Sequence, residues 1–142
     1  MSTLMRVLLA LHLETVGRSD EALTELNEAH ERDPTSPLPV FELGILHSYG
    51  YNRFGPAIAF GEQAVESNRI RPVYREILAQ MYLDLGDYER AEEVLDAAGT
   101  ETSGAVTRTY LYLYRAEPEK ARSSALAVIE THGRDWQSTD LL

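Results

Sequence analysis

The residue types that most often carry catalysis or hold metals are present, but their spacing matches no known chemical site. The four histidines lie far apart, at His12, His30, His47 and His132. They form neither an HExxH motif nor a pair four residues apart, the spacing that sets two imidazoles on one helix face for a metal ion. Each is therefore expected to be packed or solvated. The absence of cysteine excludes disulfides, thiolate nucleophiles and cysteine-based metal sites.

Carboxylates are numerous, with 23 Asp and Glu residues in the chain. Their spacing, as in Glu92, Glu93 and Asp96, fits the solvated face of a helix, whereas a catalytic pair needs opposed groups in a cleft. No GxxxxGK[ST], GxGxxG or GxSxG motif occurs. We therefore predict that the protein is not an enzyme, with no catalytic residue, no metal site and no cofactor.

The net charge of −10, from 13 Lys and Arg against 23 Asp and Glu, also excludes some partners. An acidic chain repels phosphate backbones and anionic membranes, so we predict no binding to nucleic acid. Two interpretations of the acid excess stay open. It forms the solvated outer face of the protein, or it attracts a basic partner.

An apolar segment lies near the N-terminus, from Val7 to Leu13. It is short, contains His12, precedes Glu14 and lacks a small-x-small cleavage site, so we interpret it as a buried helix and not a targeting signal. No apolar run reaches the roughly 18 residues that a membrane span needs. We expect a cytoplasmic protein without a membrane span, although a chain without cysteine is compatible with any compartment.

The elements that would position any site repeat along the chain. Gly17, Asn52 and Gly86 are separated by 35 and 34 residues. Small residues recur at fixed distances after these positions, as Ala22, Ala57 and Ala91 and then as Ala29, Ala64 and Ala98. Large–small pairs recur before them, as Leu9-Ala10, Leu43-Gly44 and Leu78-Ala79. A weaker fourth copy contains Ala116, Ala121 and Val128.

These residue types predict a series of helical hairpins. Small residues let two helices approach closely, and Gly or Asn ends a helix with a positive φ. Pro37, Pro56 and Pro118 suit the first position of a helix. The predicted helices are 3–16, 20–32, 37–50, 56–67, 72–85, 88–98, 104–115 and 118–131. The spacing also predicts one extra residue between the two helices of the second copy, near residues 49–52.

The pattern resembles the tetratricopeptide repeat, a helix–turn–helix unit of about 34 residues. The matching residues of the first copy are Leu9, Ala10, Gly17, Ala22, Leu26, Ala29 and Pro34. Those of the third copy are Leu78, Ala79, Tyr82, Gly86, Asp87, Tyr88, Ala91, Leu95 and Ala98. The second copy matches through Leu43, Gly44, Phe54, Ala57 and Ala64, and the fourth only through Tyr112, Ala121 and Val128.

The resemblance implies an all-α fold, a right-handed superhelical solenoid of antiparallel helix hairpins. It implies a repeat domain over residues 1–133, with repeats at about 3–36, 37–71, 72–101 and 102–133. A C-terminal tail over residues 134–142 would follow.

The resemblance further implies that the first helices of the hairpins line a concave groove that holds a peptide or helix of a partner protein. The predicted groove residues are Leu4, Val7, Leu11, Leu38, Phe41, Ile45, Tyr49, Gln80, Tyr110 and Tyr114. The full pattern carried over from the family adds Glu14, Thr15, Ser48, Val73, Glu76, Leu83, Asp84, Ser103, Val106 and Leu113. Family members that bind acidic chaperone tails use Lys, Asn and Arg in the groove. The corresponding positions here are Val7, Leu11, Glu42, Val73 and Ile77, so we reject that activity.

The first half of this groove is apolar, and an exposed patch of that size would need a cover. A partner helix, a second copy of the chain or another segment would provide it, or the local packing of the first two copies buries these residues. The first helix is apolar on more than one face, which suggests contact with another domain or a homodimer through that helix.

The leading functional hypothesis is a non-catalytic scaffold that binds a partner peptide or helix in the groove. The alternative is a regulatory or oligomerisation domain of a larger bacterial signalling or transcription-regulator protein. The segment Asp33–Pro37 favours the alternative, because it resembles the linker between repeats in such proteins.

Overall fold

The computed structural model describes the backbone of residues 1–97 and 104–139, and the side chains within these ranges up to residue 130. The regular elements of these residues are all helical. They are α1 (Thr3–Thr15), α2 (Ser19–Arg32), α3 (Pro37–Ile45), the π-helical segment η1 (Leu46–Gly50), α4 (Phe54–Ser67), α5 (Pro72–Leu85), α6 (Tyr88–Asp96), α7 (Ala105–Tyr114) and α8 (Pro118–Thr139). The predicted all-α class is confirmed. The predicted repeat residue Ala98 lies outside the described residues.

The last helix differs from the prediction. It ends at Thr139, whereas the sequence pattern placed its end at residue 131 and a tail from residue 134. Gly133 lies inside α8, and a glycine inside a helix costs only about 1 kcal/mol. No proline follows Gly133 to stop the helix.

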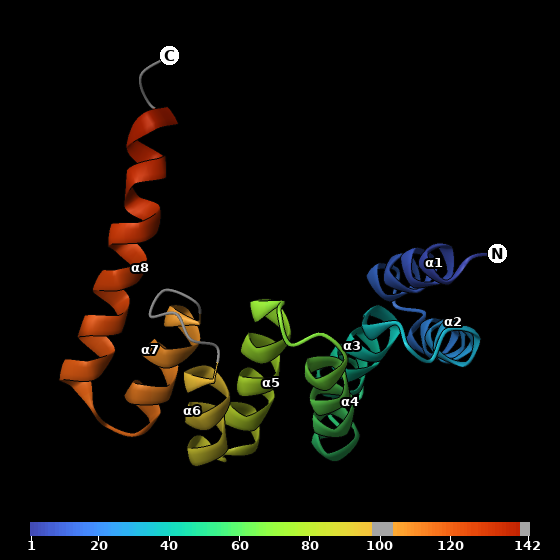
Figure 1. Cartoon of the computed structure of the whole chain (residues 1–142), viewed down its shortest axis with the longest axis horizontal. Coiled ribbons are helices and arrows are strands. Elements are labelled where there is room, and N and C mark those ends of the chain that lie inside the picture. Colours follow the sequence, from blue (N-terminus) through green and yellow to red (C-terminus); the bar gives the residue numbers. More distant parts are fainter. Residues whose placement is uncertain (98–103, 140–142) are drawn as a thin grey trace.

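The helices form successive antiparallel hairpins, each packed on the next. The pairs α1–α2, α3–α4, α5–α6 and α7–α8 make the most extensive contacts, and α2–α3, α4–α5 and α6–α7 join one hairpin to the next. Figure 1 shows the hairpins following one another along the long axis, with α1 and α2 at one end and α8 at the other. This arrangement is a helical repeat solenoid, in which each unit contacts only its neighbours.

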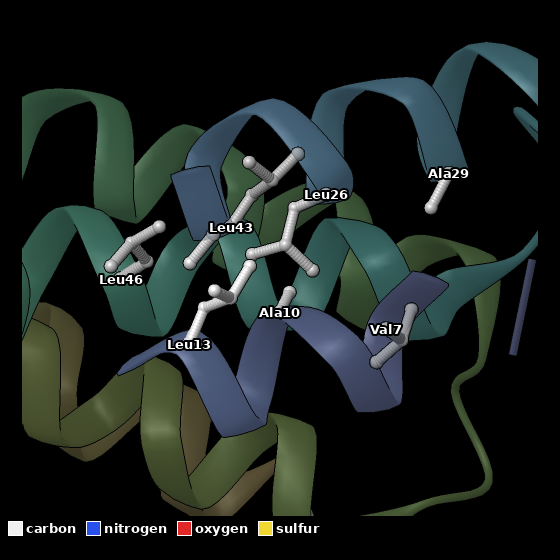
Figure 2. Packing of buried hydrophobic residues seen from close by; sticks show 8 residues of the cluster. Val7, Ala10, Leu13, Leu26, Ala29, Leu43 and Leu46 are labelled. Atoms are coloured by element: carbon white, nitrogen blue, oxygen red, sulfur yellow. The ribbon is translucent and has the colours of Figure 1, made fainter. Parts of the chain in front are cut away.

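The core consists of clusters that span neighbouring hairpins. Figure 2 shows one of them, formed by Val7, Ala10, Leu13, Leu26, Ala29, Leu43 and Leu46 from α1, α2, α3 and η1. The alanines have no exposed surface, and their small size permits the close helix approach that the repeat pattern predicted. A second contact joins α3 to α5, where the rings of Phe41 and Tyr74 lie 4.6 Å apart between centroids.

The turns between paired helices follow one plan, with one exception. After α1, the Arg18 N–H donates to the Leu13 carbonyl at 2.9 Å, and after α5 the Asp87 N–H donates to the Tyr82 carbonyl at 2.9 Å. Both bonds reach back five residues. Such bonds satisfy the last carbonyls of a helix when the next residue adopts a left-handed conformation. Gly86 meets this requirement with φ 84°.

The second hairpin takes up its extra residue in a π-helical turn. The Tyr51 N–H donates to the Leu46 carbonyl at 3.1 Å, five residues back, and the Arg53 N–H donates to the His47 carbonyl at 2.8 Å, six residues back. Asn52 takes the left-handed position with φ 54°. The extra residue predicted near residues 49–52 therefore lengthens the end of the first helix instead of the loop.

Candidate partner-binding groove

The first helices of the hairpins lie beside one another and present one shared face. α1 contacts α3, α5 contacts α7, and the Phe41–Tyr74 ring pair connects α3 with α5. A helix turns by about 100° per residue, so positions i, i+4, i+7 and i+11 form one stripe along it. Equivalent stripes on these helices define the surface that we call the groove face.

The groove face consists of accessible side chains on all four first helices. On α1 they are Leu4, Leu8, Leu11 and Thr15; on α3 and η1 they are Leu38, Glu42, Ile45 and Tyr49; on α5 they are Val73, Ile77, Gln80 and Asp84; on α7 they are Tyr110 and Tyr114. Each of these side chains is at least partly exposed. The groove face is thus aliphatic near the beginning of α1, α3 and α5 and more polar and aromatic near their ends.

The predicted groove residues divide into three groups. Leu4, Tyr49, Tyr110 and Tyr114 are exposed, and Leu11, Leu38, Ile45 and Gln80 are half-buried. Val7 and Phe41 are only 1% and 9% exposed and belong to the core between helices. For these two residues the structure agrees with the alternative given above, that local packing of the first two copies buries them.

The wider pattern carried over from the family is also only partly accessible. Ser48 and Leu83 are buried, whereas Val73, Asp84, Val106 and Leu113 are exposed. Ser103 lies outside the described residues. The predicted groove residues do not include Leu8. Glu42 and Ile77 were considered only as positions that bind acidic chaperone tails in other family members. The spacing of four residues from Leu4, Leu38 and Val73 is the signal that finds all three.

Two carboxylates lie together where α1 meets α3. Burial raises the pKa of Glu42 to about 7, with a further contribution from the negative charge of Glu14. Burial likewise raises the pKa of Glu14. The Glu14 Oε1 atom is buried and has no hydrogen-bond partner among the described residues. This pair is therefore held in an environment that disfavours its charge.

The neighbouring part of the groove face contains a smaller polar group. The Gln80 Nε2 donates to the Asp84 Oδ1 at 2.8 Å. Burial and the negative charge of Asp84 raise the pKa of Tyr49. Tyr49 of η1 and Asp84 of α5 are therefore close enough to interact across the boundary between the second and third hairpins.

The π-helical segment buries two further polar side chains. The His47 ring stacks on Phe60 at 5.4 Å between centroids, and burial together with the charge of Arg53 lowers the pKa of His47. The His47 Nδ1 atom and the Ser48 hydroxyl are buried without hydrogen-bond partners among the described residues. Both groups weaken this hairpin, since an unsatisfied buried polar atom costs about 1–3 kcal/mol.

Neither a metal-binding cluster nor a membrane helix is found in the part of the chain that the structure describes. Groups of three or more His, Asp or Glu side chains suited to a metal ion do not occur there. None of the helices described is long and apolar enough to cross a membrane.

The comparisons with known proteins concern the fold. A family model described as tetratricopeptide repeat matches residues 72–97, which include α5 and α6. No curated protein matches the sequence significantly. The structure is similar to a thermophilic tetratricopeptide repeat protein of Thermus thermophilus, with a TM-score of 0.77 and 22% sequence identity over 91% of this chain and 74% of that one.

Two further solved structures are similar over nearly the whole chain. A tetratricopeptide repeat protein of Parabacteroides merdae ATCC 43184 has a TM-score of 0.75 and 17% identity, over 92% of this chain and 54% of that one. The MamA protein has a TM-score of 0.74 and 15% identity, over 96% of this chain and 76% of that one. The chain thus spans about half of the Parabacteroides protein. Identities this low establish the fold alone.

Proposed function

Because the chain carries a tetratricopeptide repeat and has the fold of proteins built from such repeats, we propose that it is a non-catalytic scaffold that binds a peptide or helix of a partner protein on the groove face. One observation carries this proposal: equivalent positions on the first helices of four successive hairpins present accessible side chains. Many of these side chains are aliphatic or aromatic, the types that dominate binding energy in protein interfaces.

The accessible residues, and not the buried ones, define the binding surface of this proposal. Tyr49 and Tyr110 are 59% and 49% exposed, so their rings are available to a partner without any change of fold. Tyrosine supplies a large contact area at a low entropic cost, because it has few rotatable bonds. Leu11 and Ile45 are half-buried on the same stripes and would form an apolar floor.

A random peptide library displayed on phage provides a test that needs no knowledge of the natural partner. Peptides selected on the intact protein are measured against the double variant Tyr49→Ala/Tyr110→Ala. We expect at least tenfold weaker binding, which corresponds to about 1.4 kcal/mol. Both side chains are exposed, so the variant should keep the circular dichroism spectrum and melting temperature of the parent.

A matched control removes two exposed apolar side chains elsewhere. Leu126 and Ile129 on α8 are 48% and 62% exposed and do not belong to the groove face. The variant Leu126→Ala/Ile129→Ala should bind the selected peptides with unchanged affinity. If the groove variant binds as well as the parent, or if both variants lose binding equally, the groove is not the binding surface.

A second candidate function is self-association through α1, and one observation favours it. Leu4, Met5 and Leu8 of α1 are 57%, 57% and 56% exposed, and exposed apolar side chains gathered on one helix mark an interaction surface. Met5 does not belong to the groove face, so a change at Met5 tests self-association without altering the proposed binding surface. A mass from light scattering that rises to twice the monomer mass with concentration would support it, provided that the Met5→Ser variant keeps the monomer mass. A monomer at all concentrations removes it.

A further inference from the structure

The groove face carries acidic side chains but no basic ones among the described residues. Glu42 and Asp84 belong to its stripes, and Glu14 lies beside Glu42. Arginines of α1 and α7 instead pair with second helices. Arg6 pairs with Glu25 at 2.5 Å and with Glu28 at 2.6 Å, both on α2.

The same arrangement recurs at the other end of the solenoid. Arg108 of α7 pairs with Asp96 of α6 at 2.7 Å, and Arg115 pairs with Glu92 of the same helix. These three arginines therefore pair with carboxylates of second helices.

The carboxylates of Glu14 and Glu42 are the clearest example of groove charge without a counter-ion. Neither takes part in the ion pairs found among the described residues. Both are partly withdrawn from water, and the Glu14 Oε1 atom has no hydrogen-bond partner in the described part of the chain. A cation brought to this position would meet two carboxylates in a partly desolvated setting, where a charge pair is stronger than on an open surface.

Aromatic rings add a second attraction for cations. The cation–π contacts of the described residues use Tyr51, Tyr82 and Tyr112, which meet Arg53, Arg90 and Lys120. The exposed rings of the groove face, Tyr49, Tyr110 and Tyr114, take no part in these contacts. The face of a tyrosine ring attracts Arg or Lys within about 6 Å.

We propose that the groove face binds a partner segment in which aliphatic side chains alternate with Lys or Arg, the aliphatic groups lying against Leu11 and Ile45 and a cation against Glu14 and Glu42. This inference rests on the proposed function of the groove. Charge complementarity selects this occupant over a second copy of the chain, because two copies that each have a net charge of −10 repel one another.

The phage selection above also tests this inference, when it is performed at pH 8 so that Glu42 is ionised. Peptides that lose affinity on Tyr49→Ala/Tyr110→Ala are sequenced. We expect them to be enriched in Lys or Arg beside Leu, Ile or Val, relative to the unselected library. Their affinity should fall as salt rises, because salt screens the charge pairs.

Charge removal sharpens the test. We expect Glu42→Gln to lower the affinity for the selected peptides about tenfold at low salt, because the substitution removes one partner of a partly desolvated charge pair. The matched control is Glu93→Gln on α6, which removes an exposed carboxylate outside the groove face and should change affinity less than about twofold.

The outcomes separate the two proposals. Groove-dependent peptides without enrichment in Lys or Arg, or with equal affinity for Glu42→Gln, overturn the cationic inference and leave the groove function standing. Peptides that bind independently of Tyr49 and Tyr110 overturn both. Enrichment together with loss on Glu42→Gln, but not on Glu93→Gln, supports the inference.

Discussion

The second and third hairpins occupy equivalent places in the solenoid but use different local physics. The third hairpin has a regular α5, a glycine at the turn, and Asp87, whose side chain accepts a hydrogen bond from the Arg90 N–H at 3.2 Å. The second hairpin has the π-helical η1, Asn52 at the turn and no side-chain cap at Arg53. The family model matches the third hairpin and not the second.

The difference extends to buried polar groups. In the second hairpin the His47 Nδ1 and Ser48 Oγ atoms are buried without hydrogen-bond partners, whereas no such atom is found among the described residues of the third hairpin. Burial also raises the pKa of Glu42, in the second hairpin, to about 7. Unsatisfied polar atoms and departures from regular helix cost stability and persist where surrounding packing holds them. The comparison teaches that the second hairpin contains costs to stability that the third hairpin lacks, and that it also contributes Glu42 to the groove face.

The largest effect is expected from a substitution that removes the ring contact between these two hairpins. Phe41→Ala should lower the free energy of unfolding by about 3–5 kcal/mol, because it removes a buried ring that packs on Tyr74. The control on the same first helix, Tyr49→Ala, removes a ring that is 59% exposed and should cost about 0.5 kcal/mol or less. Urea titrations measure both. Equal losses for the two variants would show that Phe41 is not part of the core.

A smaller effect sharpens the comparison at the turns. Gly86→Ala should lower the free energy of unfolding by about 1–2 kcal/mol, because the φ of 84° at this position is a left-handed conformation that strains any residue with a Cβ. The open space around Gly86, with nothing within 4 Å of an added Cβ, makes this a test of backbone conformation alone.

The matched change in the second hairpin is Asn52→Gly. Asparagine already tolerates the left-handed conformation, so we expect a change within about 0.5 kcal/mol, in contrast to the loss for Gly86→Ala. Thermal melts of both variants measure the difference. A loss for Asn52→Gly as large as that for Gly86→Ala would mean that the asparagine side chain itself stabilises the π-helical turn.

The helices and their order could be predicted from the sequence because their signals are local. Leu78-Ala79 and Gly86 mark a close contact and a helix end through residue type alone. The orientation of each first helix could not be predicted in the same way. Val7 and Phe41 follow Leu4 and Leu38 by three residues, while the accessible Leu8 and Glu42 follow them by four.

One residue rotates a helix position by about 100°, so the choice between a spacing of three and of four decides which side chain faces the groove. Which of the two positions faces the groove depends on how each hairpin is rotated relative to its neighbours. The residue types of a single repeat do not specify this rotation. The π-helical turn was missed for a related reason: spacing reveals an extra residue, but packing around Leu46 decides where it is accommodated.

A third effect concerns Glu42 and has a defined dependence on pH. The pKa of Glu42 is about 7 in the folded protein, above its value of 4.5 in the unfolded chain, because burial and Glu14 disfavour the charge. The folded state therefore binds more protons than the unfolded state between pH 4.5 and 7. The stability associated with protonated Glu42 is complete below pH 4.5 and is lost as pH rises through 7.

Glu42→Gln mimics the protonated side chain and should remove this dependence. The variant should match the parent near pH 4 and be more stable at pH 8, by about 1 kcal/mol once solvent screening of the partly exposed carboxyl is considered. Urea unfolding of both proteins across this range measures the difference. A stability difference that does not vary with pH would show that Glu42 is solvated, and the second hairpin would then lose the buried charge that distinguishes it from the third.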